Sequence, residues 1–110
     1  MVSYSNALKE SALGVPSAML ERFGAVSAEV AEAMARGARE RLGCAWSIAV
    51  TGVAGPGGGT PDKPVGLVDV AVGGADGVEV RELRLHGDRE RIRMRSSTIA
   101  LHLLRTALQA

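Results

Sequence analysis

The chain has 110 residues, 46% of them hydrophobic, a net charge of +1, one cysteine and only three aromatic residues. This length suits one small domain with a single core. The near-neutral charge and scarce aromatic side chains argue against nucleic-acid binding. A lone cysteine excludes a disulfide framework, and no apolar run of about 18 residues is present, so we expect a cytoplasmic protein without a membrane span.

The first part of the chain is predicted to be helical. Helices are expected over residues 6–13, 17–22 and 28–42, because a serine or a proline stands where each would begin and a glycine follows each closely. The third has the clearest pattern, with apolar residues recurring every three or four positions. Ahead of them, residues 2–4 favour the end of a strand.

Three strands are predicted next. Residues 45–51 form an almost continuous apolar run, which is typical of a strand buried on both faces. Residues 66–72 and 78–85 flank a glycine-rich turn and are expected to pair as an antiparallel hairpin. The apolar alternation of the last strand changes phase, which predicts a bulge near residues 81–82.

The chain is predicted to end in a helix that Asp88 caps. Its predicted core stripe consists of Ile92, Ile99, Leu103 and Ala107. We therefore expect one α/β domain over residues 1–110, with a mixed β-sheet flanked by helices in three α/β/α layers.

The most distinctive segment is the glycine-rich stretch over residues 51–66, which begins where a predicted strand ends. Ligands of open α/β sheets bind at that position, and successive glycines let backbone N–H groups surround an anion. Pro61 and Pro64 forbid the helix that a Walker or dinucleotide motif requires, so neither motif fits. An ordinary flexible loop remains the alternative.

A second constellation surrounds Lys9. Arginine outnumbers lysine eleven to two, so Lys9 and Lys63 are candidates for positions that need an amine able to lose its proton. If a helix starts near Asn6, Lys9 can fold back toward Tyr4, and a desolvated amine beside a phenol can accept a proton. A solvated lysine and a half-buried tyrosine are the alternative.

A third constellation opens the last helix. Arg89 and Arg93 share one helix face, and a helix N-terminus with a guanidinium can hold a phosphate or carboxylate. A solvated face is the alternative. His86 and His102 are too far apart for a helical metal pair, so no metal site is predicted, and Cys44 is expected in the core.

These motifs together resemble the C-terminal domain of the competence/damage-inducible CinA proteins, the nicotinamide-nucleotide amidohydrolase family. The resemblance rests on residues 4–6 with Lys9, 13–15, 24–27, 51–59, 63–66 and 87–89. It implies a metal-free and cofactor-free hydrolase that converts nicotinamide mononucleotide into nicotinic acid mononucleotide and ammonia. It also implies a homodimer and a three-layer fold.

The resemblance also implies residue roles. Lys9 would be the catalytic base or proton relay, and Tyr4 its catalytic partner. Arg89, with Arg93, would hold the substrate's phosphate. The remaining substrate-binding residues would be Asn6, Thr51, Gly52, Gly55, Gly57, Gly58 and Gly59.

Family members carry roughly fifty further residues ahead of the Tyr-Ser-Asn motif, including the serine nucleophile, and these 110 residues do not include them. We therefore expect a domain whose first part is missing, and no ammonia release by the chain alone at rates typical of enzymes. A phosphate-binding module without turnover is the main alternative. An interaction domain and a substitute nucleophile among Ser3, Ser5 and Thr51 are weaker hypotheses.

Overall fold

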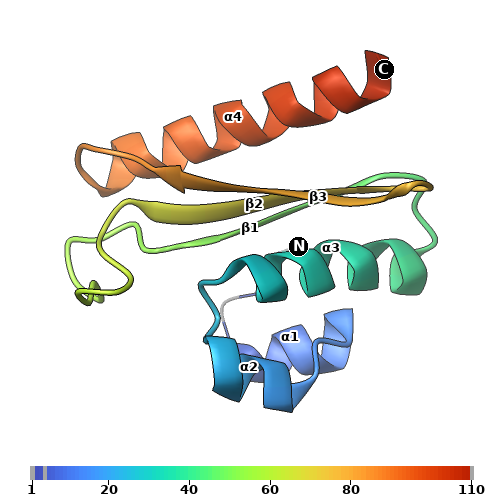
Figure 1. Ribbon diagram of the computed structural model, residues 1–110, viewed down its shortest axis with the longest axis horizontal. Helices are drawn as coiled ribbons and strands as arrows, with labels where there is room; N and C mark the ends of the chain where they lie inside the picture. Colours follow the sequence, from blue (N-terminus) through green and yellow to red (C-terminus); the bar gives the residue numbers. More distant parts are fainter. Residues whose placement is uncertain (1, 4, 110) are drawn as a thin grey trace.

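The computed structural model describes residues 2–3 and 5–109. A three-stranded sheet lies between two helices, α3 (Ala28–Leu42) on one face and α4 (Arg89–Gln109) on the other (Figure 1). Helices α1 (Asn6–Leu13) and α2 (Ser17–Phe23) pack against α3 on the side away from the sheet. The predicted α/β class with helices on both sheet faces is confirmed.

The predicted starts of α1, α3 and α4 are confirmed by capping bonds, while α2 begins after Pro16 without a side-chain cap. The Ser5 hydroxyl accepts a hydrogen bond from the Leu8 amide at 3.0 Å, and the Ser27 hydroxyl accepts one from the Val30 amide at 3.2 Å. At α4, a carboxylate oxygen of Asp88 accepts from the Arg91 amide at 2.9 Å. These bonds satisfy amides that have no partner inside their helices.

The sheet contains β1 (Ser47–Gly52), β2 (Leu67–Gly74) and β3 (Gly77–Arg84), in the order β1-β2-β3. Both strand pairs are antiparallel, so the expected mixed sheet is not found among the described strands. The reason lies in the connections. A parallel neighbour needs a long crossover, usually helical, whereas a helix-free loop and a tight turn join these strands.

The strand that is buried along its whole length is β2, the central strand, and not β1 as predicted. In β1, Val50 is 41% exposed. Among the described strands β1 lies at the edge of the sheet, and its apolar run is not covered along its whole length.

The bulge predicted in β3 is absent, because β3 pairs with β2 without interruption from Leu67 opposite Arg84 to Gly74 opposite Gly77. The change of phase has another cause. Val78 and Val80 pack into the core on the α3 side, whereas Leu83 packs into the core on the α4 side. Because both faces of the sheet are covered, the apolar residues of one regular strand can switch from one face to the other.

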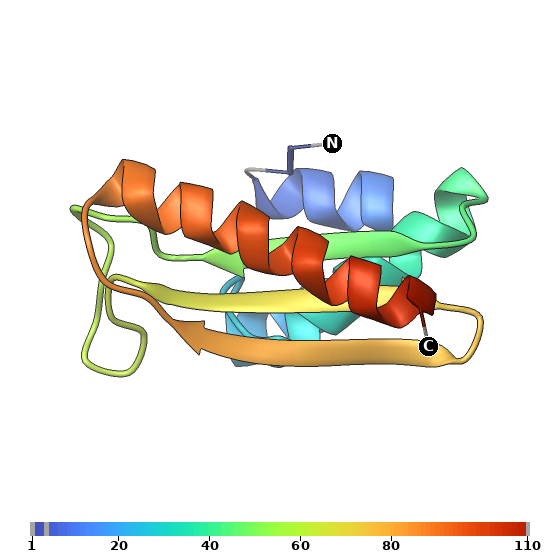
Figure 2. The same ribbon diagram turned by 90° about the horizontal axis from the view of Figure 1, so that it is seen from above.

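Helix α4 crosses the sheet diagonally (Figure 2) and buries Ile92, Ser96 and Ala100. Ile99 and Leu103 pack beside them, as predicted, while Ala107 is half-buried. No helix within residues 5–109 is long and apolar enough to cross a membrane.

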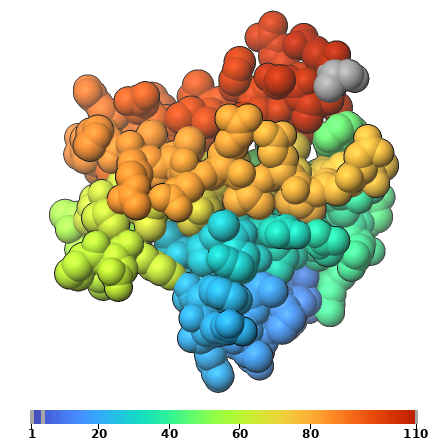
Figure 3. Space-filling model, in the orientation of Figure 1, coloured from blue at the N-terminus to red at the C-terminus, as the bar shows by residue number. Residues whose placement is uncertain are grey.

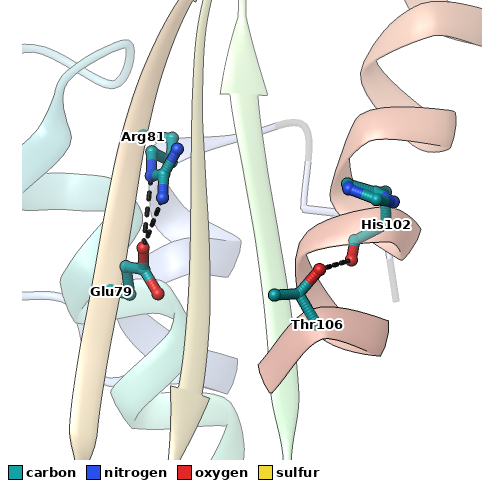
Figure 4. Close-up of polar contacts among 4 residues, drawn as sticks. All are labelled: Glu79, Arg81, His102 and Thr106. Atoms are coloured by element: carbon teal, nitrogen blue, oxygen red, sulfur yellow. Dashed lines mark hydrogen bonds and ion pairs between the residues drawn. The ribbon is translucent and has the colours of Figure 1, made fainter. Parts of the chain in front are cut away.

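The outer edge of the sheet is polar. Arg81 pairs with Glu79 at 2.9 Å on exposed β3, and across the sheet on α4 the Thr106 hydroxyl donates to the His102 carbonyl at 3.0 Å (Figure 4). The ion pair of Arg81 and Glu79 is more than half exposed, so it contributes only about 0–1 kcal/mol. Cys44 is also exposed, contrary to prediction, because it follows Gly43, which ends α3, in the link to β1.

Candidate functional site

The glycine-rich loop and the start of α4 lie at the same end of the molecule (Figure 2). They are in direct contact, since Nη1 of Arg89 donates to the carbonyl oxygen of Gly55 at 3.1 Å across 34 residues of sequence. Two of the three constellations singled out in the sequence, the loop and the arginines, are thus brought together by the fold.

Arg93 lies one turn further along α4 and is exposed. It lines a cavity of about 210 Å³ between α4 and the β1–β2 side of the sheet, together with Gly52 and Ser97. A larger cavity of about 440 Å³, between α3 and the link from α1 to α2, contains none of the predicted site residues.

The loop is anchored at its base and open at its tip. The Val53 amide donates to the Leu67 carbonyl at 2.9 Å, and the Gly66 amide donates to the Val53 carbonyl at 2.8 Å. The tip residues Gly57, Gly58 and Gly59 are exposed, and among the described residues their amides have no hydrogen-bond acceptor. Those N–H groups can therefore donate to a bound anion.

Lys9 is a buried amine. Its side chain lies on α1, is 5% exposed, and its Nζ donates to the Ser3 carbonyl at 2.6 Å. Burial lowers the pKa of the Lys9 amine below its ordinary value, because the charged form loses hydration. No carboxylate among the described residues forms an ion pair with it.

The other residues of the Lys9 constellation are less informative. Asn6 is exposed in the first turn of α1, while the predicted partner Tyr4 lies outside the described residues. Within the described part of the chain, no hydrogen bond joins Lys9 to the glycine-rich loop.

Thr51 is buried at the end of β1, where its hydroxyl donates to the Ala25 carbonyl at 2.8 Å. This bond ties the end of the strand to the segment between α2 and α3. The structure therefore gives Thr51 a positioning contact beneath the loop, while its predicted contact with substrate stays a prediction.

The sequence interpretation missed Asp69. It lies in the middle of β2, is 2% exposed, and its Oδ1 has no hydrogen-bond partner among the described residues. Burial raises the pKa of the Asp69 carboxyl, the charges of Glu82 and Glu29 raise it further, and the charge of Lys63 opposes them. The available signal was one aspartate within the apolar run Leu-Val-Asp-Val-Ala-Val.

No group of three His, Cys, Asp or Glu side chains in residues 2–3 and 5–109 is arranged to hold a metal ion. The prediction of a metal-free site is therefore left as a prediction. The polar groups that remain are an amine, a hydroxyl, guanidinium groups and free backbone amides, which suit the binding of anions and the acceptance of protons.

Comparisons with known proteins agree on one family. The model of the CinA C-terminal domain matches residues 1–108. A CinA-like protein of Anaeromyxobacter dehalogenans strain 2CP-C is 52% identical over 109 residues, which are 99% of this chain and 27% of that protein. One of Mycolicibacterium vanbaalenii is 57% identical, covering 98% of this chain and 26% of that protein.

Solved structures extend the comparison to the fold. The competence/damage inducible protein CihA of Agrobacterium tumefaciens has a TM-score of 0.94 and 43% identity over 99% of this chain and 67% of that one. A CinA superfamily protein of Escherichia coli has a TM-score of 0.89 and 36% identity over 94% and 60%. The chain thus spans about a quarter of the curated relatives and about two thirds of the solved chains it matches.

Proposed function

This chain belongs to the CinA C-terminal domain family, and from this premise we propose that it supplies the base and the substrate-binding loop of a nicotinamide-nucleotide amidohydrolase. The reaction is the hydrolysis of the carboxamide of nicotinamide mononucleotide, with water consumed and ammonia released. The observation that carries the proposal is the buried Lys9 amine, which lies on the family's Tyr-Ser-Asn and lysine motif.

Lys9 has the properties of a general base. A catalytic base works best when its pKa lies near the working pH, and burial lowers the pKa of Lys9 in that direction. The neutral amine would take the proton from a hydroxyl nucleophile as the hydroxyl oxygen attacks the carboxamide carbon. The same proton would then pass to the carboxamide nitrogen, which leaves as ammonia. Lys9 would next take a proton from the water that hydrolyses the resulting ester and would return it to the hydroxyl oxygen, so that acid and free hydroxyl are formed.

The glycine-rich loop and Arg89 would bind the negatively charged groups of the substrate and of the reaction intermediate. The free amides of the loop tip can donate to the oxyanion that forms when the carboxamide is attacked. Arg89 uses one donor on Gly55, which leaves further guanidinium N–H groups for the substrate's phosphate. Arg93, at the neighbouring cavity, would be the second phosphate ligand.

The nucleophile is the serine that the family resemblance places in a segment ahead of the Tyr-Ser-Asn motif. We propose that this segment lies beside Lys9 in the active protein. A homodimer, a cytoplasmic location and a cofactor-free reaction complete the proposal by the same resemblance. The alternative, a phosphate-binding module without turnover, rests on the contact between Arg89 and the loop.

A calorimetric titration of the chain with nicotinamide mononucleotide tests the proposal. We expect saturable binding, weakened about ten- to hundredfold in Arg89→Ala, since a hydrogen bond to a charged group contributes about 1.5–3 kcal/mol. Nicotinamide riboside, which lacks the phosphate, should bind wild type more weakly than the nucleotide binds Arg89→Ala, because it also loses the contact with Arg93.

Arg95→Ala is the matched control, because Arg95 is exposed on the same helix. Its affinity should equal that of wild type. Equal binding by Arg89→Ala, or no binding by wild type, would contradict the proposal. Ammonia release separates the two candidate functions, because the binding module predicts none even when the serine-bearing segment is supplied.

A further inference from the structure

A polar cluster lies beneath the glycine-rich loop, with Thr51 and Asp69 buried and Glu82 exposed, and it takes no part in the proposed chemistry. Thr51, Asp69 and Glu82 are cross-strand partners on β1, β2 and β3, so their side chains share the sheet face that α3 covers. Glu29, in the first turn of α3, and Lys63, in the loop, are near enough for their charges to act on the pKa of Asp69. Glu82 forms an ion pair with Arg84 at 3.2 Å, and no ion pair within 4 Å joins Lys63 to a carboxylate among the described residues, so Lys63 acts on Asp69 over a longer distance.

Lys63 joins two segments that are far apart in the sequence. Its Nζ donates to the carbonyl oxygen of Phe23, at the end of α2, across 40 residues. In the space-filling view the loop lies beside this part of the chain (Figure 3). The backbone of Lys63 is fixed as well, since its amide donates to the Thr60 hydroxyl at 3.0 Å and its carbonyl accepts from the Thr60 amide at 2.9 Å.

Gly24 makes room for the ammonium. A Cβ on Gly24 would lie 2.7 Å from Nζ of Lys63, and the φ of +77° is one that other residues rarely adopt. Beside it, the Ser27 hydroxyl donates to the Gly24 carbonyl at 2.9 Å, which fixes the turn. The turn is therefore shaped to receive the end of the lysine side chain.

The buried carboxylate of Asp69 favours the presence of a cation nearby. Its Oδ1 and Oε2 of Glu29 are buried without hydrogen-bond partners among the described residues. Uncompensated buried carboxylate charge is costly, so the nearby cation stabilises this arrangement. Lys63 provides that cation and is part of the loop. A change in the charge of Asp69 should therefore change how firmly the loop is held.

We infer that Lys63 is a tether that positions the glycine-rich loop against the turn between α2 and α3, and that the buried carboxylate of Asp69 favours the charged form of this tether. Lys63 is the link and Asp69 the charge that retains it, so both act as positioning residues. The tether is a property of the fold, whereas its consequence for the nucleotide rests on the proposed function.

Amide hydrogen exchange of the loop in the intact chain tests the tether. Lys63→Met keeps most of the aliphatic stem and removes the ammonium, so exchange of the backbone amides at positions 60 and 63 should accelerate about tenfold or more, the equivalent of one hydrogen bond to a charge. Gly24→Ala should have the same effect from the other side. Asp62→Ala, at an exposed neighbour in the loop, is the control and should leave the exchange unchanged.

The pH dependence separates a charge tether from simple packing. As the pH falls through the raised pKa of Asp69, its charge is lost and the loop should exchange faster after correction for the intrinsic rate. Asp69→Asn should exchange fast at every pH and lack this step, while Glu29→Gln and Glu82→Gln should keep it. Slow loop exchange in Lys63→Met, or a pH step that survives in Asp69→Asn, would overturn the inference.

Nucleotide binding is the second measurement, and it keeps the two proposals separate. If the proposed function holds, Lys63→Met should bind nicotinamide mononucleotide about tenfold more weakly, as expected for losing about 1.4 kcal/mol of loop positioning. Faster loop exchange in Lys63→Met without nucleotide binding by wild type would support the tether and reject the proposed function.

Discussion

Gly37→Ala is expected to lower the free energy of unfolding by about 3 kcal/mol or more, the upper range for overpacking a core. A Cβ at Gly37, in the middle of α3, would lie 1.7 Å from the carbonyl oxygen of Leu13 at the end of α1. The obstacle is backbone, which cannot rotate away as a side chain can. The two helices would therefore have to separate, exposing apolar core such as Leu13 and Val15.

Destabilisation by a glycine-to-alanine substitution inside a helix is unusual, so the result would be informative. Alanine normally stabilises a helix interior by about 1 kcal/mol relative to glycine. Urea unfolding of Gly37→Ala measures the difference, with Arg36→Ala as the control, since Arg36 is half-exposed and forms an ion pair with Glu32, which is also half-exposed. Equal or greater stability of Gly37→Ala would mean that α1 does not pack on α3 as described.

Lys9→Met is expected to lower ammonia release from nicotinamide mononucleotide by roughly 10²- to 10⁴-fold, the usual contribution of a general base. The assay uses the chain joined to the serine-bearing segment that the family resemblance implies. Methionine fills a similar volume and removes the buried amine, so the variant should fold and bind the nucleotide as wild type does. Full activity of Lys9→Met would exclude Lys9 as the base.

The pH dependence of stability provides a companion result for Lys9. Its pKa is lowered in the folded chain, so between that pKa and the ordinary 10.5 the unfolded chain binds more protons. The stability of wild type relative to Lys9→Met should therefore rise as the pH rises through this interval. Unfolding midpoints of the two proteins over this range measure the difference.

The helices were predictable because their signals are local. Ser5, Ser27 and Asp88 each cap the helix that follows, and a glycine ends α1 and α3. Local rules do not show which strand is central. The apolar run of β1 and that of β2 are similar in the sequence, and only the order β1-β2-β3 makes β2 the buried strand.

The parts of the candidate site that belong to a sequence motif were predictable. The link between Arg89 and the glycine-rich loop joins two segments that the sequence had singled out, although the contact itself depends on tertiary structure. Asp69 was missed because it stands alone within an apolar run and its neighbours come from three other elements. The contact of Lys63 with Phe23 spans 40 residues, and no spacing rule predicts it.

The most direct test of the base assignment is an NMR titration of the Lys9 side-chain nitrogen in the intact chain, assigned by comparison with Lys9→Met. The chain contains only one other lysine, Lys63, so the spectrum is simple. We predict a pKa for Lys9 clearly below the ordinary 10.5, because the amine is buried. A pKa at or above that value would mean that the amine is hydrated or paired, and would contradict its role as the base.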